Sequence, residues 1–247
     1  MPWSAFSGLR MYLNEYTGRG VSVAIVDSGV HAAHPHVQGV EQGIAICDDG
    51  SLDDDFVDRL GHGTAVAAAI REKAPDVRLM AIKVFWRTLA TDVSLLVRGI
   101  DEAAERGAAV INLSLGTSNL AHKPLVEAAV RRASARGACV VAAGEDQGVC
   151  WLPGAIDGVV PVTLDWQCPR EEYRVTWSGG RSGVAASGYP RDIPSVSRER
   201  NLKGISFAVA NASGFLARAS EAAPGATVTE LLAILEGALA QPIPGGV

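Results

Sequence analysis

Apolar runs and helix-like patterns alternate along the middle of the chain. Continuous apolar runs, which are typical of buried strands, occupy residues 21–27, 76–85, 109–116, 138–148 and 158–163. Amphipathic or alanine-rich stretches, which are typical of helices, occupy residues 61–70, 92–108, 123–137 and 204–217. This alternation predicts an α/β fold of three layers, in which helices cover both faces of a mostly parallel, twisted central sheet.

The last part of the chain has weaker periodicity. Residues 165–201 are rich in Gly, Pro, Ser and Arg, and they predict loops with short strands. Thr227 and Glu230 have the spacing of a capping box, which predicts that a final amphipathic helix begins there. Because we find no linker, repeat or low-complexity segment, we predict one domain over residues 1–247.

Composition narrows the classes of partner. The 247 residues are 48% apolar and 20% charged, with a formal net charge of -5. An acidic balance argues against nucleic-acid binding and against a membrane-surface role. The sequence shows neither a secretory signal at Met1 nor an apolar run long enough to span a bilayer. We therefore expect a cytoplasmic protein that has neither nucleic acid nor a membrane as partner.

The four cysteines do not have the spacing of a structural zinc site. Cys139 lies in an apolar run and is expected to be a buried thiol. A disulfide between Cys150 and Cys168 stays open as an alternative, although the simplest interpretation is a reduced protein.

Other metal-binding patterns are also incomplete. Three histidines lie close together, at His31, His34 and His36. Pro35 interrupts them, and no carboxylate lies at helical spacing from them, as a metal site would require. The acidic run at residues 48–58 does not have the EF-hand pattern, with its glycine and distal glutamate at the required spacing, so we interpret it as a solvated loop. We predict no metal and no cofactor.

Ser206 stands at the start of the alanine-rich helix predicted at residues 204–217. A serine there is either an N-cap or a nucleophile held at the positive end of the helix dipole. A nucleophilic serine needs a base to take its proton and an acid to orient that base. Asp27 follows a buried strand, and His62 lies between two glycines at a helix start, so the chain contains all three residue types.

The chain resembles the subtilisin-like serine proteases, or subtilases. The matching stretches are VAIVDSGVHAAHP, GHGTAVAAAI, VINLSLG, VVAAG, VAASG and GISFAVANASG, which follow in family order between residues 20 and 216. The resemblance implies a subtilisin-like fold and a serine endopeptidase that acts through an acyl-enzyme. In that role Asp27 orients the imidazole, His62 is general base and then general acid, and Ser206 is the nucleophile.

The resemblance also implies a cleft for a peptide or protein substrate. A peptide would add there as a strand through backbone hydrogen bonds. The residues that line this cleft are expected to be Ser114, Leu115, Gly116, Ala142, Ala143 and Gly144.

Glu145 departs from the family pattern, which has an asparagine that donates to the oxyanion. An ionised carboxylate only accepts, and the loss of such a donor costs about 10²–10³ in kcat. Three interpretations stay open: Glu145 is protonated in a desolvated pocket and donates, Gln147 donates instead, or the site is slow or not hydrolytic. Ile205 and the pair Ala210–Asn211 also depart, where the family has Thr and Pro-His.

Three functions remain from the sequence. The first is a dedicated cytoplasmic protease that processes a peptide, the second a peptide ligase or cyclase on the same triad, and the third a weakly active or inactive peptide-binding relative. Met1 lies about as far before Asp27 as the start of a mature subtilase would. The resemblance therefore predicts that the protein folds without a prodomain or that a separate partner replaces it.

Overall fold

One large sheet organises the protein, whose computed structural model describes residues 13–239. The strands run in the order β3-β2-β4-β1-β5-β6-β8-β10-β9, and β7 pairs with β6. The pairs from β2 to β10 along this order are parallel, whereas β3, β7 and β9 pair antiparallel with their neighbours. The strands are β1 (Ser22–Asp27), β2 (Gln42–Ile46), β3 (Leu52–Asp53), β4 (Arg78–Lys83), β5 (Val110–Leu113), β6 (Cys139–Asp146), β7 (Val149–Cys150), β8 (Val159–Leu164), β9 (Tyr173–Ser178) and β10 (Arg181–Ala186).

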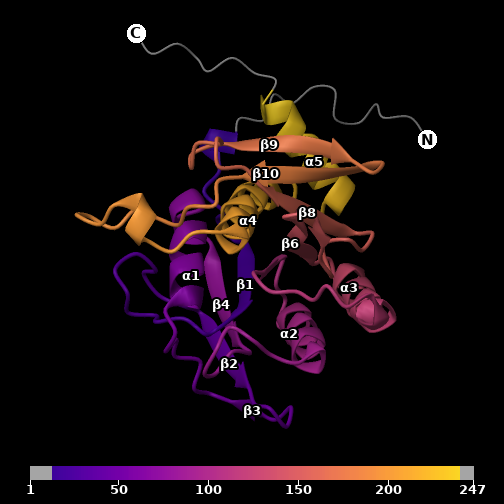
Figure 1. Cartoon of the computed structure of the whole chain (residues 1–247). Coiled ribbons are helices and arrows are strands. Elements are labelled where there is room, and N and C mark those ends of the chain that lie inside the picture. The colour runs from indigo at the N-terminus through magenta and orange to yellow at the C-terminus, as the bar shows by residue number, and fades with distance from the viewer. Residues whose placement is uncertain (1–12, 240–247) are drawn as a thin grey trace.

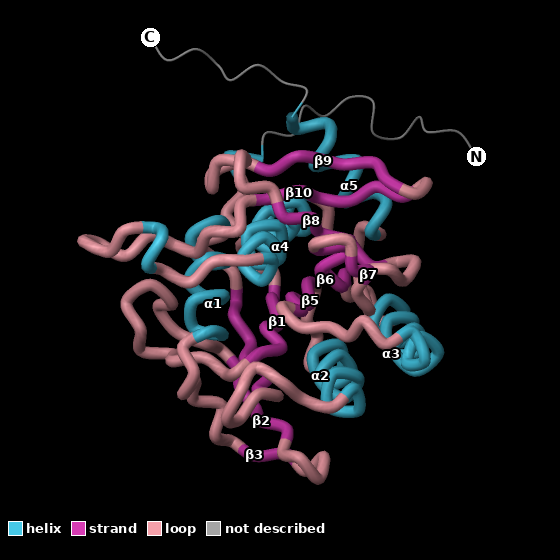
Figure 2. Tube along the Cα trace, viewed as in Figure 1, coloured by secondary structure: helices cyan, strands magenta, loops and turns pink. Residues whose placement is uncertain are grey.

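Helices cover both faces of the sheet, as the sequence predicts (Figure 1). One layer holds α1, α4 and α5, and the other holds α2 and α3. Figure 2 shows long loops to the left of α1 and β2. The helices are α1 (His62–Lys73), α2 (Val93–Glu105), α3 (Lys123–Ala135), α4 (Ile205–Ala222) and α5 (Val228–Leu239), with short 3-10 turns η1 (Leu13–Glu15), η2 (Leu120–His122) and η3 (Arg198–Arg200).

Strand β1 lies at the centre of the sheet and is buried on both faces. Successive side chains of a strand point to opposite faces. Val23 and Ile25 accordingly join the core under α1 and α4, whereas Ala24 and Val26 join the core under α2. This double burial explains the continuous apolar run, and it leaves Asp27 at the carboxyl end of the strand.

Helix α4 crosses α1 at close range inside its layer. Nearly every residue from Phe207 to Ala217 is buried. A methyl group added at Gly214 would lie 2.5 Å from the Cβ of Lys73, so a glycine is needed at this crossing. The close packing fixes the start of α4, where Ser206 lies, relative to the start of α1, where His62 lies.

One hairpin was not predicted from the sequence. At the end of the apolar run 138–148, Glu145 and Asp146 continue β6 and pair with β7. Gln147 and Gly148 both have positive φ angles, which match the twist of a two-residue hairpin turn. Residues 165–201 contain short strands as predicted, and β9 and β10 join through the glycine pair at 179–180.

All four cysteines are free, so the Cys150–Cys168 disulfide that the sequence left open does not form. Cys150 is exposed on β7, while Cys168 is buried. Cys139 is a buried thiol as predicted, and burial raises its pKa to about 12.

The capping box at the start of α5 forms as predicted. Glu230 accepts hydrogen bonds from the backbone N–H and the hydroxyl of Thr227. Among residues 13–239, no helix combines the length and the apolar character that crossing a membrane requires.

Candidate active site

Asp27 and His62 meet at the carboxyl edge of the sheet. Nδ1 of His62 lies 2.8 Å from Oδ1 and 3.0 Å from Oδ2 of Asp27. Asp27 is fully buried, and His62 is 8% exposed. The backbone N–H of Ser28 also donates to Oδ1 of Asp27, at 2.7 Å. The carboxylate is therefore positioned to hold the imidazole with its Nδ1 protonated and its Nε2 free.

Glycines allow α1 to approach β1 this closely. A methyl group at Gly63 would lie 2.1 Å from the carbonyl oxygen of Gly29 and 3.2 Å from the side chain of Asp27. Gly61, at the N-cap of α1, has a φ of 83°, in the left-handed region that favours glycine. The two glycines around His62 are therefore required by backbone geometry.

Ser206 is the second residue of α4 and caps nothing. The N-cap position belongs to Gly204, whose φ is 140°, and no side chain caps the helix there. The N-cap alternative for Ser206 is therefore wrong. The next residue, Phe207, has its ring centroid 5.6 Å from that of His62, which brings the start of α4 to the imidazole.

The Ser206 hydroxyl is hydrogen-bonded to the chain itself. It donates to the carbonyl oxygen of Ser114 at 3.4 Å, and the Ser114 hydroxyl donates to the carbonyl oxygen of Ser206 at 3.2 Å. In residues 13–239, no hydrogen bond joins Ser206 to His62. Hydrogen bonds between catalytic groups are often long or misaligned before substrate binds.

Asp58 is a residue of this site that the sequence interpretation missed. It ends the run interpreted as a solvated loop, but it is only 9% exposed. Oδ1 accepts from the Ser28 hydroxyl and from the backbone N–H groups of Leu60 and Gly61. Oδ2 accepts from the backbone and the hydroxyl of Thr64. Its position just before a predicted helix start, where acidic residues are favoured, was the available signal.

Ser28 connects Asp58 to the other acid of the site. Its hydroxyl donates to Asp58 and accepts from the backbone N–H of Gly63, each at 2.9 Å. Asp58 and Ser28 together fix the first turn of α1 against the end of β1.

The two titratable groups beside the helix start have shifted pKa values. Burial disfavours the charged imidazole of His62, but the hydrogen bond and charge of Asp27 outweigh it and raise the pKa of His62. Burial likewise disfavours the Asp58 carboxylate, but hydrogen bonds from Thr64 and from backbone N–H groups lower the pKa of Asp58.

Of the two predicted substrate-binding segments, residues 114–116 follow β5, and residues 142–144 lie within β6. Part of their backbone is already paired: the N–H of Trp151 donates to the carbonyl oxygen of Gly144 at 3.1 Å. Thr117, next to Gly116, exchanges two backbone hydrogen bonds with Leu152. The chain's own segment 151–152 thus forms part of the wall of this region.

Glu145 and Gln147 lie on the β6–β7 hairpin, and both side chains are exposed. The desolvated pocket that one interpretation required around Glu145 is absent. Asn211, another departure, is buried and donates to the carbonyl oxygens of Ser187 and Tyr189. It thereby anchors the segment that leads into α4.

A sequence model of the Subtilase family (Peptidase_S8) matches residues 18–241. The chain therefore belongs to the subtilase family, which consists of serine peptidases.

Curated relatives are proteases of low identity. Subtilisin E of Bacillus subtilis (strain 168) is 29% identical over 209 residues, which are 79% of this chain and 52% of that protein. A thermophilic serine proteinase of Bacillus sp. (strain AK1) is 33% identical over 156 residues, which are 58% of this chain and 38% of that protein. The matched regions thus span only about half of these relatives or less.

Solved structures share the fold. A cold adapted subtilisin-like serine proteinase aligns with a TM-score of 0.68 and 22% identity, covering 88% of this chain and 81% of the other. Sphericase aligns with the same TM-score and 23% identity, covering 88% of this chain and 82% of the other. The protein therefore has the subtilisin-like three-layer fold.

Proposed function

We propose that this protein is a serine endopeptidase in which Asp27, His62 and Ser206 act together. The observation that carries the proposal is the pairing of buried Asp27 with Nδ1 of His62, because it prepares the imidazole as a base. The seat of Ser206 in the first turn of α4, beside the His62–Phe207 contact, supports the role of nucleophile.

The reaction follows from these positions. Nε2 of His62 takes the proton of the Ser206 hydroxyl while Oγ bonds to the carbonyl carbon of the scissile peptide. Nε2 then gives this proton to the departing amine, the C–N bond breaks and an acyl-enzyme remains. A water attacks the ester by the same route and releases the acid. Asp27 keeps Nδ1 protonated throughout.

We expect substrate binding to break the hydrogen bond between the Ser206 hydroxyl and the carbonyl oxygen of Ser114. The Ser206 hydroxyl and a peptide N–H compete for the carbonyl oxygen of Ser114. A substrate strand that donates to Ser114 therefore frees the hydroxyl to turn toward His62.

A serine-directed fluorophosphonate probe tests the proposal. We expect the native protein to form a covalent adduct that peptide mapping places on Ser206, because the probe reacts only with an activated hydroxyl. Ser206→Ala is the control and should carry no adduct. An unlabelled native protein across the pH range would overturn the proposal and favour a peptide-binding relative without catalysis. Mass spectrometry of products separates hydrolysis from peptide ligation.

We expect Glu145 to slow the enzyme, because a carboxylate repels the oxyanion, whereas an amide donates a hydrogen bond to it. Glu145→Asn should therefore raise kcat about tenfold. Gln147→Ala, on the same hairpin, should leave kcat near the wild-type value. Steady-state rates on one fluorogenic peptide measure both variants. A fall in kcat for Glu145→Asn would contradict this role of Glu145.

We further propose a dedicated role in processing a peptide in the cytoplasm. An exposed free thiol at Cys150 favours a reducing compartment. A carboxylate at the position where the resemblance expects a donating asparagine fits slow turnover of one substrate better than bulk degradation.

A further inference from the structure

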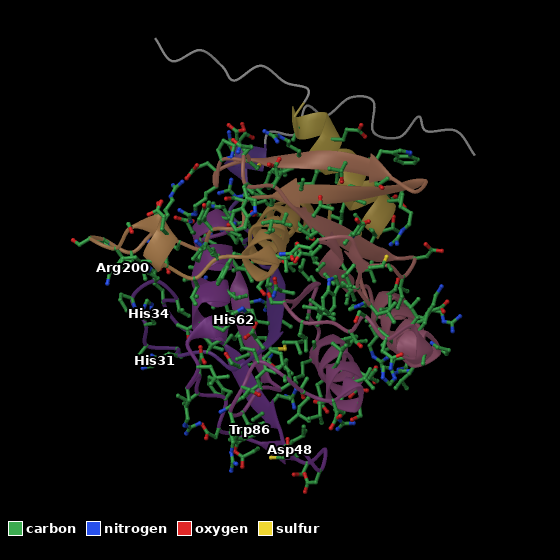
Figure 3. All side chains as sticks on the ribbon, in the orientation of Figure 1. His31, His34, Asp48, His62, Trp86 and Arg200 are labelled. Atoms are coloured by element: carbon green, nitrogen blue, oxygen red, sulfur yellow. The ribbon has the colours of Figure 1, made fainter. Side chains whose placement is uncertain are left out.

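A cavity of about 500 Å³ lies beside the N-terminus of α1. It is bounded by the segment after β1 and by the loop that leads into α4. Figure 3 shows His31, His34 and Arg200 together on one side of His62. Its polar lining includes His31, His34, Asp58, Arg191, Arg200 and Asn201.

The cavity adjoins the reacting groups. Gly61 and Thr64, on either side of His62, both line it, and Leu202 lines it four residues before Ser206. Strands β5 and β6, which lead into the segment 114–116 and contain the segment 142–144, lie to the right of α4 in Figure 2, whereas His31, His34 and Arg200 lie to the left of His62 in the same view (Figure 3). A peptide that extends from those segments across Ser206 therefore continues toward the cavity.

The leaving half of a substrate is the half that enters this cavity. His62 must protonate the departing amine, so that amine lies against the imidazole. The residues after the cleaved bond then lie next to Gly61 and Thr64.

The charge of the cavity favours an anion. Arg200 is exposed and, among residues 13–239, it has neither an ion pair nor a hydrogen bond to its guanidinium. The guanidinium of Arg191 donates one long hydrogen bond within the described part of the chain, to the carbonyl oxygen of His36 at 3.4 Å. The carboxylate of Asp58 is occupied by hydrogen bonds from its own chain. The lining thus carries the two guanidinium charges of Arg191 and Arg200 against the single carboxylate charge of Asp58, whose oxygens are already hydrogen-bonded.

Apolar side chains also line the cavity, and they suit the aliphatic part of a substrate side chain. Ile193, Val196 and Leu202 are each more than 40% exposed although they lie together on this loop. Ala65 and Ala68 of α1 face them across the cavity.

We propose that this cavity binds an acidic side chain, Asp or Glu, within the first residues after the cleaved bond of the substrate. The proposal rests on the proposed peptidase function. Arg200 supplies the principal charge, and it acts on specificity without touching the reacting atoms.

A peptide pool tests this assignment. All peptides of the synthetic pool share one sequence before the cleaved bond and are randomised at the three positions after it. Purified enzyme cleaves the pool, and mass spectrometry identifies the products. We expect Asp or Glu to be enriched about tenfold there, the factor that one charge-assisted hydrogen bond supplies. Arg200→Glu should abolish the enrichment and favour Lys or Arg, whereas Arg200→Lys should keep it. Arg136→Glu, an exposed arginine at the end of α3, is the matched control and should behave as wild type.

A binding measurement separates the two proposals. Ser206→Ala is titrated by calorimetry with an acidic hexapeptide, hexaglutamate, and with hexalysine. If the native protein forms no fluorophosphonate adduct, but Ser206→Ala binds hexaglutamate and loses this binding on Arg200→Glu, the peptidase function fails while the cavity assignment stands. Cleavage without an acidic preference, or a preference that survives Arg200→Glu, would overturn the cavity assignment and leave the peptidase function intact.

Discussion

Asp27→Asn should lower kcat/KM about 10⁴-fold with little change in fold. The backbone N–H of Ser28 donates to Oδ1, so the amide oxygen of an asparagine would keep this partner. The amide NH₂ would then take the place of Oδ2, which lies 3.0 Å from Nδ1 of His62. It would force the imidazole to accept at Nδ1 and to carry its proton on Nε2, which could no longer take the proton of Ser206.

The pH dependence of kcat/KM in the wild type tests the same interaction between Asp27 and His62. Protonated imidazole cannot act as a base, so kcat/KM should fall on the acidic side as pH drops through the pKa of His62. Because Asp27 raises that pKa, the acidic limb of the wild type should lie above the ordinary histidine value of 6.5. In Asp27→Asn the limb should move to lower pH.

Initial rates on a fluorogenic peptide measure the loss of kcat/KM in Asp27→Asn. Circular dichroism checks that the variant keeps its fold. Asp101→Asn is a matched control, because Asp101 pairs with Arg132 on the α2–α3 layer, away from the site. An Asp27→Asn variant with more than a tenth of wild-type activity would contradict the role assigned to Asp27.

Asp58→Ala should lower the free energy of unfolding by about 3 kcal/mol, because it leaves several buried donors without an acceptor. These donors include the N–H groups of Leu60, Gly61 and Thr64, which begin α1. We also expect lower activity, since the first turn of α1 positions His62.

The contribution of Asp58 depends on pH. Its pKa is lower in the folded state than in the unfolded state, so its stabilisation is complete above the unfolded pKa. The stabilisation is lost as pH falls through the folded pKa. The difference between wild type and Asp58→Ala should therefore shrink toward low pH.

Urea unfolding at several pH values tests this prediction. Asp48→Ala is the control, since Asp48 is exposed at the other end of the same acidic run. Equal effects of Asp48→Ala and Asp58→Ala would show that Asp58 is only part of a solvated loop.

The sequence predicted the layers of the fold because local patterns carry them. The apolar run that ends at Asp27 reflects burial on both faces of the sheet, which is a property of one strand and its neighbours. The glycines around His62 mark a close approach of two backbones, and a glycine pattern is visible in the chain itself. Three candidate residues could therefore be named before any contact was known.

The role of Asp58 was not predicted, because an acidic residue leaves the same pattern in the sequence whether it is solvated or surrounded by donors from other segments. The hairpin at Glu145 was not predicted, because it depends on the pairing of β6 with β7. The donors of Asp58 come from Ser28, in a different loop, and from the first turn of α1.

By itself the sequence determined the α/β class, the order of most elements and the residue types of a nucleophile, a base and an acid. Only the tertiary structure decided that Asp58 is buried, that Glu145 is exposed on a hairpin, and that Arg200 lies beside a cavity next to His62. Periodicity and backbone constraints are local and leave their mark on neighbouring residues. The surroundings of a charged side chain depend on segments that only folding brings together.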